Sequence, residues 1–173
     1  MTEIEKLLEM NYEYVCDYLK NKYGNVPKDY FVDKTILLST PEWARISPFN
    51  YQKADRLVYC NLLEHLVLHI KIFEYPYPNK NPMMAVGVGG IFEFIVPELN
   101  DIYSGIQYKQ PWKQKVIENI ISLKTEYFKC IKKIIELNFP YSLLNSFNTK
   151  YGLWNNEIYE QLKKLIYFQK KLL

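Results

Sequence analysis

The chain is poor in several residue types on which common sites and scaffolds depend. Its 173 residues include only two histidines, two arginines and three cysteines. Cys16, Cys60 and Cys130 lie far apart and form no CxxC pair, which excludes a disulfide framework or a zinc ribbon and indicates reduced thiols. No apolar run approaches the roughly 18 residues that a membrane-spanning helix needs. The first residues also lack a signal-peptide pattern, so we expect a cytoplasmic protein without a membrane partner.

The overall composition is that of a folded protein. Hydrophobic residues make up 49% of the chain and charged residues 24%, so disorder is excluded and a single domain over residues 1–173 is expected. The charge is uneven, because residues 106–173 hold 12 basic and 5 acidic side chains whereas residues 1–105 hold 10 and 14. This basic, aromatic-rich C-terminal part could contact phosphates, although a solvated lysine face on long helices is the simpler interpretation.

Apolar periodicity and capping residues predict a mostly α-helical fold. Thr2 and Glu5 form a capping box that opens a first helix, and Gly24 closes that helix. Asn61 caps a helix that runs to about residue 75, and its apolar character nearly all round predicts a central place in the core. The β structure expected is confined to residues 28–60. Within it, residues 36–39 are typical of a strand, and residues 56–60 of a strand or a helix. Further helices are expected over 91–103, over 111–138 and from about 156 toward the end. In the helix over 111–138, Trp112, Ile120 and Ile121 are expected to face inward.

The only two histidines lie four residues apart on the predicted apolar helix. His65 and His69 therefore face the same side. Two neutral imidazoles in this arrangement can share a divalent metal, and the alternative is a pair of rings whose nitrogens satisfy hydrogen bonds within the fold. Because residues 66–68 are Leu-Val-Leu, no glutamate base lies between the histidines, and a metalloprotease of the HExxH type is disfavoured.

Three other features invite a functional interpretation. The segment Gly87-Val88-Gly89-Gly90 lacks the glycine order of nucleotide-binding loops, so it indicates a tight turn or a close helix approach. Glu98 and Asp101 could ligate a cation, but carboxylates on a helix surface are the simpler interpretation. The tryptophans are interpreted as core or groove anchors rather than base-stacking platforms; they are Trp43, Trp112 and Trp154.

The histidine-bearing segment resembles a known motif. Residues 57–69, LVYCNLLEHLVLH, resemble the second half of the HNH nuclease motif in its phage-associated branch, and stretches across 28–155 are similar to HNH-like proteins of phages and low-GC Gram-positive bacteria. The resemblance implies a small ββα-metal element within residues 28–75 that binds Mg²⁺, Mn²⁺ or Zn²⁺ and hydrolyses DNA or RNA. It also implies that His65 is a metal ligand and that His69 is an extra ligand or supports it.

The first half of the motif departs from the family. Where a His-His or Asp-His pair is expected, the chain has Lys28-Asp29-Tyr30, and where the family has Asn, nine residues before the helix histidine, it has Arg56. Asp29 would then serve as metal ligand or base, and Arg56 would contact phosphate.

Two hypotheses follow from a motif whose second half matches the family and whose first half departs from it. The first is a divergent metal-dependent nuclease with His65, His69 and Asp29 as metal ligands and with Asp29, His65 and Arg56 in catalysis. The second is a catalytically inactive phage or mobile-element protein in the host cytoplasm. Such a protein would bind and inhibit a host defence nuclease, as anti-CRISPR proteins do, or would bind nucleic acid. The sequence leaves the oligomeric state open.

Overall fold

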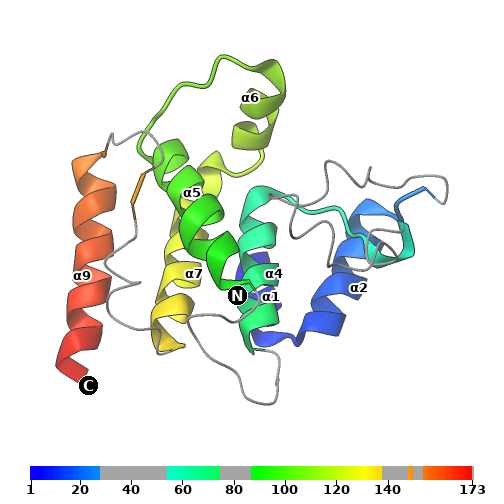
Figure 1. Ribbon diagram of the computed structural model, residues 1–173, viewed down its shortest axis with the longest axis horizontal. Helices are drawn as coiled ribbons and strands as arrows, with labels where there is room; N and C mark the ends of the chain where they lie inside the picture. Colours follow the sequence, from blue (N-terminus) through cyan, green and yellow to red (C-terminus); the bar gives the residue numbers. More distant parts are fainter. Residues whose placement is uncertain (28–53, 75–86, 138–147, 150–153, 173) are drawn as a thin grey trace. The chain divides into compact units, whose positions relative to one another are not determined.

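The computed structural model describes residues 1–27, 54–74, 87–137, 148–149 and 154–172 (Figure 1). In this part of the chain the regular structure is helical and no strand occurs, which confirms the mostly α fold class. Also within these ranges, no helix combines the length and apolar character needed to cross a membrane. The elements are α1 (Glu3–Glu9), α2 (Tyr12–Tyr23), η2 (Ala54–Arg56), α4 (Leu62–Glu74), the π-helix η3 (Gly90–Ile95), α5 (Val96–Tyr103), α6 (Pro111–Glu118), η4 (Ile121–Leu123), α7 (Lys124–Glu136) and α9 (Asn156–Leu172).

The predicted β structure is not found where it can be checked. Residues 36–39 lie outside the described residues. Residues 57–60 were expected to form a strand or a helix, but they follow the 3-10 turn η2 with no regular structure. The ββα element therefore stays a prediction.

The chain is divided into two compact units. One contains residues 1–12 and 61–173, and the other contains residues 13–60. The larger unit holds α1 and every element from α4 onward, while the smaller unit holds η2 and nearly all of α2. The boundary at residue 61 falls inside the predicted HNH-like segment 28–75, and the single domain over 1–173 stays a prediction.

Helix α4 is the centre of the larger unit. It contacts α1, α5, α7 and η3 (Figure 1). Its buried residues lie on all sides, which confirms the predicted core helix: they are Leu63, Glu64, Leu66, Val67, Leu68, Ile70, Lys71 and Phe73. Within residues 63–71, only His65 and His69 are not buried. The histidines therefore mark the one narrow stripe on which α4 is uncovered.

The start of α4 is fixed by the predicted cap. The Asn61 side-chain oxygen accepts hydrogen bonds from the backbone N–H groups of Leu63 and Glu64, both at 2.9 Å. The Glu64 carboxylate in turn accepts from the Asn61 backbone N–H at 2.7 Å. These bonds satisfy backbone donors that the first turn of a helix leaves without partners. The cap thus sets the register in which His65 and His69 share a side.

Two predicted helices are interrupted, which corrects the sequence-based prediction. The first helix stops at Glu9, because Met10 is extended, and resumes at Tyr12. The helix expected over 111–138 breaks between α6 and α7. At that break Ile120 is fully buried, and its carbonyl accepts a hydrogen bond from the Tyr103 hydroxyl at 2.9 Å. The break changes the helical phase, so two residues expected to face inward are exposed, Trp112 by 63% and Ile121 by 48%.

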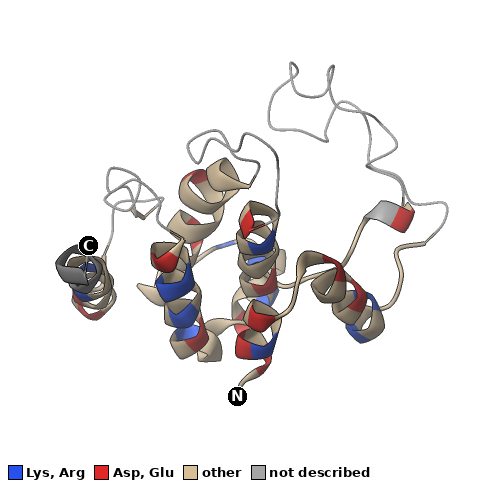
Figure 2. Cartoon of the chain, turned by 90° about the horizontal axis from the view of Figure 1, so that it is seen from below, with Lys and Arg blue, Asp and Glu red and all other residues tan. Residues whose placement is uncertain are grey.

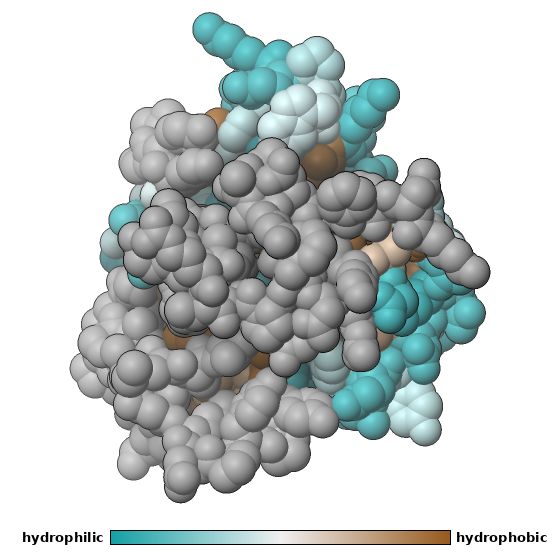
Figure 3. All heavy atoms as spheres, turned by 45° about the vertical axis from the view of Figure 1, so that its right-hand side comes forward, coloured by the Kyte–Doolittle hydropathy of each residue, from teal (hydrophilic) through white to brown (hydrophobic). Residues whose placement is uncertain are grey.

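Polar and ionic contacts join the central helix to its neighbours. The buried Lys71 ammonium donates to the Leu8 carbonyl of α1 at 2.5 Å and to Glu74 at 2.6 Å. Glu74 also pairs with Lys133 of α7 at 3.0 Å. Figure 2 shows the bands of acidic and basic residues along these helices. On the face drawn in Figure 3, the described surface is mainly hydrophilic, with small apolar areas.

Removing the cap of α4 should weaken the fold by a modest, measurable amount. We expect Asn61→Ala to lower the free energy of unfolding by about 1–2 kcal/mol, because two backbone donors lose their acceptor. Asn61→Asp, which keeps the acceptor, should stay within about 0.5 kcal/mol of wild type. Urea unfolding followed by circular dichroism measures both, and equal stability of the two variants would contradict the assignment of the cap.

Candidate functional site

The two histidines meet on the uncovered stripe of α4. His65 is exposed and His69 is half-buried. Their Nε2 atoms lie 3.2 Å apart, with ring centroids at 4.8 Å and ring planes inclined by 62°. The spacing of four residues along the helix therefore places both rings on one side, as the sequence predicted, and in the structure they meet edge to face.

The ring of His69 is held from its other side by the turn before η3. Its Nδ1 lies 2.9 Å from the Gly87 carbonyl oxygen. A carbonyl can only accept, so Nδ1 carries the hydrogen and, in the neutral ring, Nε2 of His69 has a free lone pair. The hydrogen in the contact between the two rings then belongs to Nε2 of His65. The network thus assigns one tautomer to each histidine.

Two glycines make room for this arrangement. Gly87 has φ +95°, a conformation that favours glycine, and a Cβ at Gly90 would overlap the Cε1 and Nδ1 atoms of His69. Gly89 lies between them, and a Cβ there would meet nothing within 4 Å. The glycine segment is therefore a tight turn with a close helix approach, as predicted. The sequence did not reveal that the side chain it approaches is His69.

Both imidazoles are biased toward the neutral form. Desolvation by the surrounding protein, and then the neighbouring His69, lower the pKa of His65 to about 4, although the charge of Glu98 acts in the opposite direction. Desolvation also lowers the pKa of His69, while its bond to the Gly87 carbonyl raises it. Neutral imidazole is the form that binds metals, so at pH 7 the pair needs to lose no proton to act as a ligand.

An ion pair lies beside the histidines. Glu98 of α5 is close enough to act on His65 electrostatically and accepts a hydrogen bond from the Lys113 ammonium of α6. The Lys113 side chain is 11% exposed and that of Glu98 18%. Because the two charges neutralise each other, the lysine does not leave an isolated positive charge near the imidazoles. Glu98 is therefore not the simple surface carboxylate expected, and Asp101, on the same helix, is fully buried.

The four predicted site residues have different outcomes. The structure brings His65 and His69 together. Asp29 lies outside the described residues, and Arg56 is in η2 of the smaller unit, whose placement relative to the histidines is not defined. Among the described residues, no group of three or more His, Cys, Asp or Glu is placed to hold a metal. The described part of the site is thus a two-histidine half-site.

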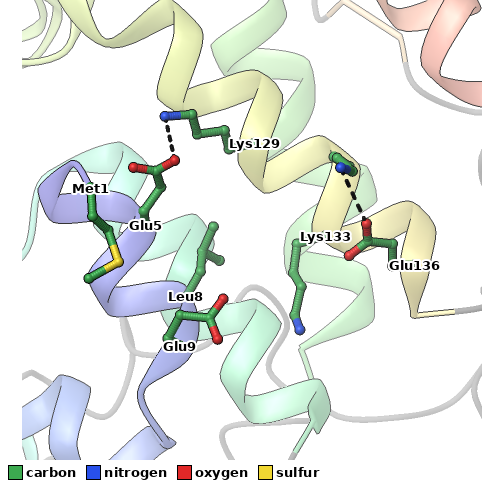
Figure 4. Close-up of a pocket in the computed structure, with 8 residues that line it drawn as sticks. Met1, Glu5, Leu8, Glu9, Lys129, Lys133 and Glu136 are labelled. Carbon is green, nitrogen blue, oxygen red and sulfur yellow. Dashed lines mark ion pairs between the residues drawn. The ribbon is translucent and has the colours of Figure 1, made fainter.

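Two surface cavities lie elsewhere in the larger unit. The first, of about 470 Å³, lies between α1 and α7 and is lined by Met1, Glu5, Leu8, Glu9, Lys129, Lys132, Lys133 and Glu136 (Figure 4). Its three lysines, Lys129, Lys132 and Lys133, form ion pairs with Glu5, Glu136 and Glu74 at 2.8, 3.9 and 3.0 Å, and this compensation gives no preference for a charged ligand. The second cavity, of about 510 Å³ between α7 and α9, is bordered by an ion pair of Lys124 and Glu157 at 2.8 Å.

Comparisons with protein-family models, with curated proteins and with solved structures find no match to this chain.

The two neighbouring glycines offer a matched test of the site. Gly90→Ala should destabilise the protein by about 1–3 kcal/mol, because the new methyl group forces the His69 ring to move. Gly89→Ala should be neutral or stabilising by up to about 1 kcal/mol, since its methyl group enters open space in a helix. Thermal unfolding of both variants tests this, and equal melting temperatures would show that His69 is not confined by Gly90.

The histidines also predict a pH dependence of stability. A histidine with a lowered folded pKa binds its proton first in the unfolded chain, so stability is fullest above about pH 6.5 and declines as the pH falls toward 4.5. The pKa values of two carboxyls are lowered as well. The Lys129 ammonium lowers the pKa of Glu5, and burial raises the pKa of Glu74 but Lys71 and Lys133 lower it by more. Because such carboxyls have a pKa near 4.5 in the unfolded chain, they begin to remove stability below about pH 5.5.

Urea unfolding at intervals between pH 7.5 and 5.5 isolates the effect of the histidines, because the chain has no other histidine and the carboxylates contribute only below this window. The double variant His65→Gln, His69→Gln should show a flat free energy of unfolding across this window. A decline as steep in the double variant as in wild type would contradict the assignment.

Proposed function

We propose that the chain is a metal-dependent, HNH-like phosphodiesterase in which His65 and His69 hold the metal. The observation that supports this is the 3.2 Å separation of the two Nε2 atoms. Nitrogens bonded to one metal at about 2.0–2.1 Å, with bond angles between about 90° and 109°, lie about 2.9–3.4 Å apart. The two rings are therefore already spaced as a bidentate ligand pair, on an exposed stripe that a cation can reach.

A metal would replace the hydrogen bond between the rings. For both Nε2 lone pairs to face the metal, the proton of His65 must move from Nε2 to Nδ1. The exposed side chain of His65 allows water to accept from Nδ1–H. His69 needs no change, because its Nδ1–H already donates to the Gly87 carbonyl, which is the supporting contact that metal-binding histidines usually have.

The donor set bears on which metal is bound. Two imidazoles favour Zn²⁺ over Mg²⁺ and Mn²⁺, which prefer oxygen ligands. The remaining ligand positions would go to water, to a phosphate oxygen of the substrate and to Asp29. A divalent cation in that place supplies a Lewis acid that stabilises negative charge on the phosphate. In this proposal Asp29 also serves as base and Arg56 contacts the phosphate, within a ββα element over residues 28–75.

The alternative is a protein without catalysis that binds a defence nuclease or nucleic acid in the host cytoplasm. It is favoured by one observation, the lack of a third metal ligand among the described residues. A two-histidine site would then bind metal weakly or serve only to fasten α4 to the turn at Gly87. The following experiment separates the two roles.

Purified protein should cleave labelled DNA or RNA when Mn²⁺, Zn²⁺ or Mg²⁺ is added, and EDTA should stop the reaction. We expect His65→Ala and His69→Ala each to reduce the rate at least about 100-fold, because each removes one of two described ligands. Glu93→Gln removes an exposed carboxylate from the adjacent η3 and should leave the rate unchanged.

Circular dichroism establishes that the variants are folded. Cleavage that persists in the double alanine variant would exclude the histidine site. A folded wild-type protein that cleaves neither DNA nor RNA with any of the three metals would exclude the enzyme and favour the binding protein.

A further inference from the structure

A second feature beside the histidines has the composition of a nucleic-acid contact. Residues 107–115, QYKQPWKQK, contain three lysines, two aromatic residues and no acidic residue. All except Tyr108 and Lys113 are exposed, and Trp112 is exposed by 63%. The prediction that this tryptophan anchors a core or groove is therefore wrong. Basic residues interleaved with aromatic residues are typical of surfaces that bind single strands.

Local contacts hold this segment in a defined shape. The Lys113 ammonium lies 5.1 Å from the centre of the Trp112 ring and 5.2 Å from that of Tyr108. The Gln114 side chain donates to the Tyr108 carbonyl at 3.2 Å, and the Tyr108 hydroxyl is 3.5 Å from Asp101. One side chain thus fixes the positions of both rings, so the cost of ordering an aromatic platform on binding is reduced.

The same lysine connects the platform to the histidine pair. Lys113 is bound to Glu98, whose charge acts on His65. Since Lys113 is neutralised by Glu98, the charges available to a ligand are those of Lys109 and Lys115, both exposed. A strand of nucleic acid that stacks a base on Trp112 and places phosphates on these two lysines would lie close to the proposed metal.

We infer that residues 107–115 form a binding platform for single-stranded nucleic acid, with Trp112 as the stacking residue and Lys109 and Lys115 as the phosphate contacts. This inference names the substrate form and rests on the proposed function for its role in cleavage. A duplex keeps its bases stacked inside, whereas a single strand can offer a base to an exposed indole. The platform should therefore favour a single strand over a duplex of the same length.

Fluorescence anisotropy with a labelled 20-nucleotide oligo(dT), in EDTA so that no cleavage occurs, measures binding alone. Trp112→Ala should weaken binding about tenfold or more, Trp112→Phe should restore most of it, and a 20-base-pair duplex should bind more weakly. Tyr167→Ala is the matched control, because it removes an aromatic side chain that is 56% exposed on α9.

The lysines are tested by the salt dependence of the same binding. Lys109→Gln with Lys115→Gln should reduce the slope of log K against log salt by about 1.4, since each phosphate contact on a single strand contributes about 0.7. Lys132→Gln with Lys163→Gln, both exposed on α7 and α9, should leave the slope unchanged.

The outcomes separate this inference from the proposed function. Binding that depends on Trp112, in a protein that cleaves nothing, would support the platform and exclude the phosphodiesterase. Cleavage that requires the histidines, with binding indifferent to Trp112, Lys109 and Lys115, would overturn the platform alone. Loss of binding in the α7 and α9 control instead would place the contact on the basic C-terminal helices and would also overturn it.

Discussion

The site depends on the confinement of one imidazole ring. The His69 ring is held on one side by the Gly87 carbonyl. On another side it lies against Gly90, where a side chain would overlap it. That confinement sets its tautomer, directs its Nε2 lone pair toward His65 and brings the two nitrogens to the spacing of a metal-ligand pair. If the ring could rotate, neither the separation nor the neutral state of the pair would be defined. A turn 18 residues away in the sequence therefore determines how the two rings on the helix are placed.

The surrounding structure gives this pair a stable base and a balanced electrostatic environment. Helix α4 is buried on nearly all sides, so the helix cannot rotate and carry the histidines away without moving the core. Among the residues that the structure describes, Glu98 acts on His65 electrostatically, and its ion pair with Lys113 is nearly neutral as a whole. A cation at the two nitrogens therefore does not meet Lys113 as an uncompensated charge. The same ion pair orders the exposed aromatic segment next to it, so metal binding and strand binding would share one structural support.

Much of the helical fold could be predicted from the sequence, because caps and apolar periodicity are local signals. The box at Asn61, the central place of α4 and the shared side of His65 and His69 are confirmed. The break near Ile120 could not be predicted, since it coincides with a tertiary contact, the hydrogen bond from the Tyr103 hydroxyl to the Ile120 carbonyl. Apolar periodicity continues across such a break. The partners of His69 and Glu98 also come from distant segments and leave no periodic trace. The basic, aromatic composition of residues 106–173 did indicate a phosphate contact, but a solvated lysine face, with Trp112 as a core or groove anchor, was the preferred interpretation.

The most direct test of the central claim is a Zn²⁺ titration at pH 7, followed through the ring signals of the two histidines by NMR. With no other histidine in the chain, each signal belongs to one of these two rings. If the Nε2 atoms form one site, both ring signals shift together and the change is complete at one metal ion per chain. A titration that moves only one ring, or that leaves both unchanged at a large excess of metal, would contradict the account.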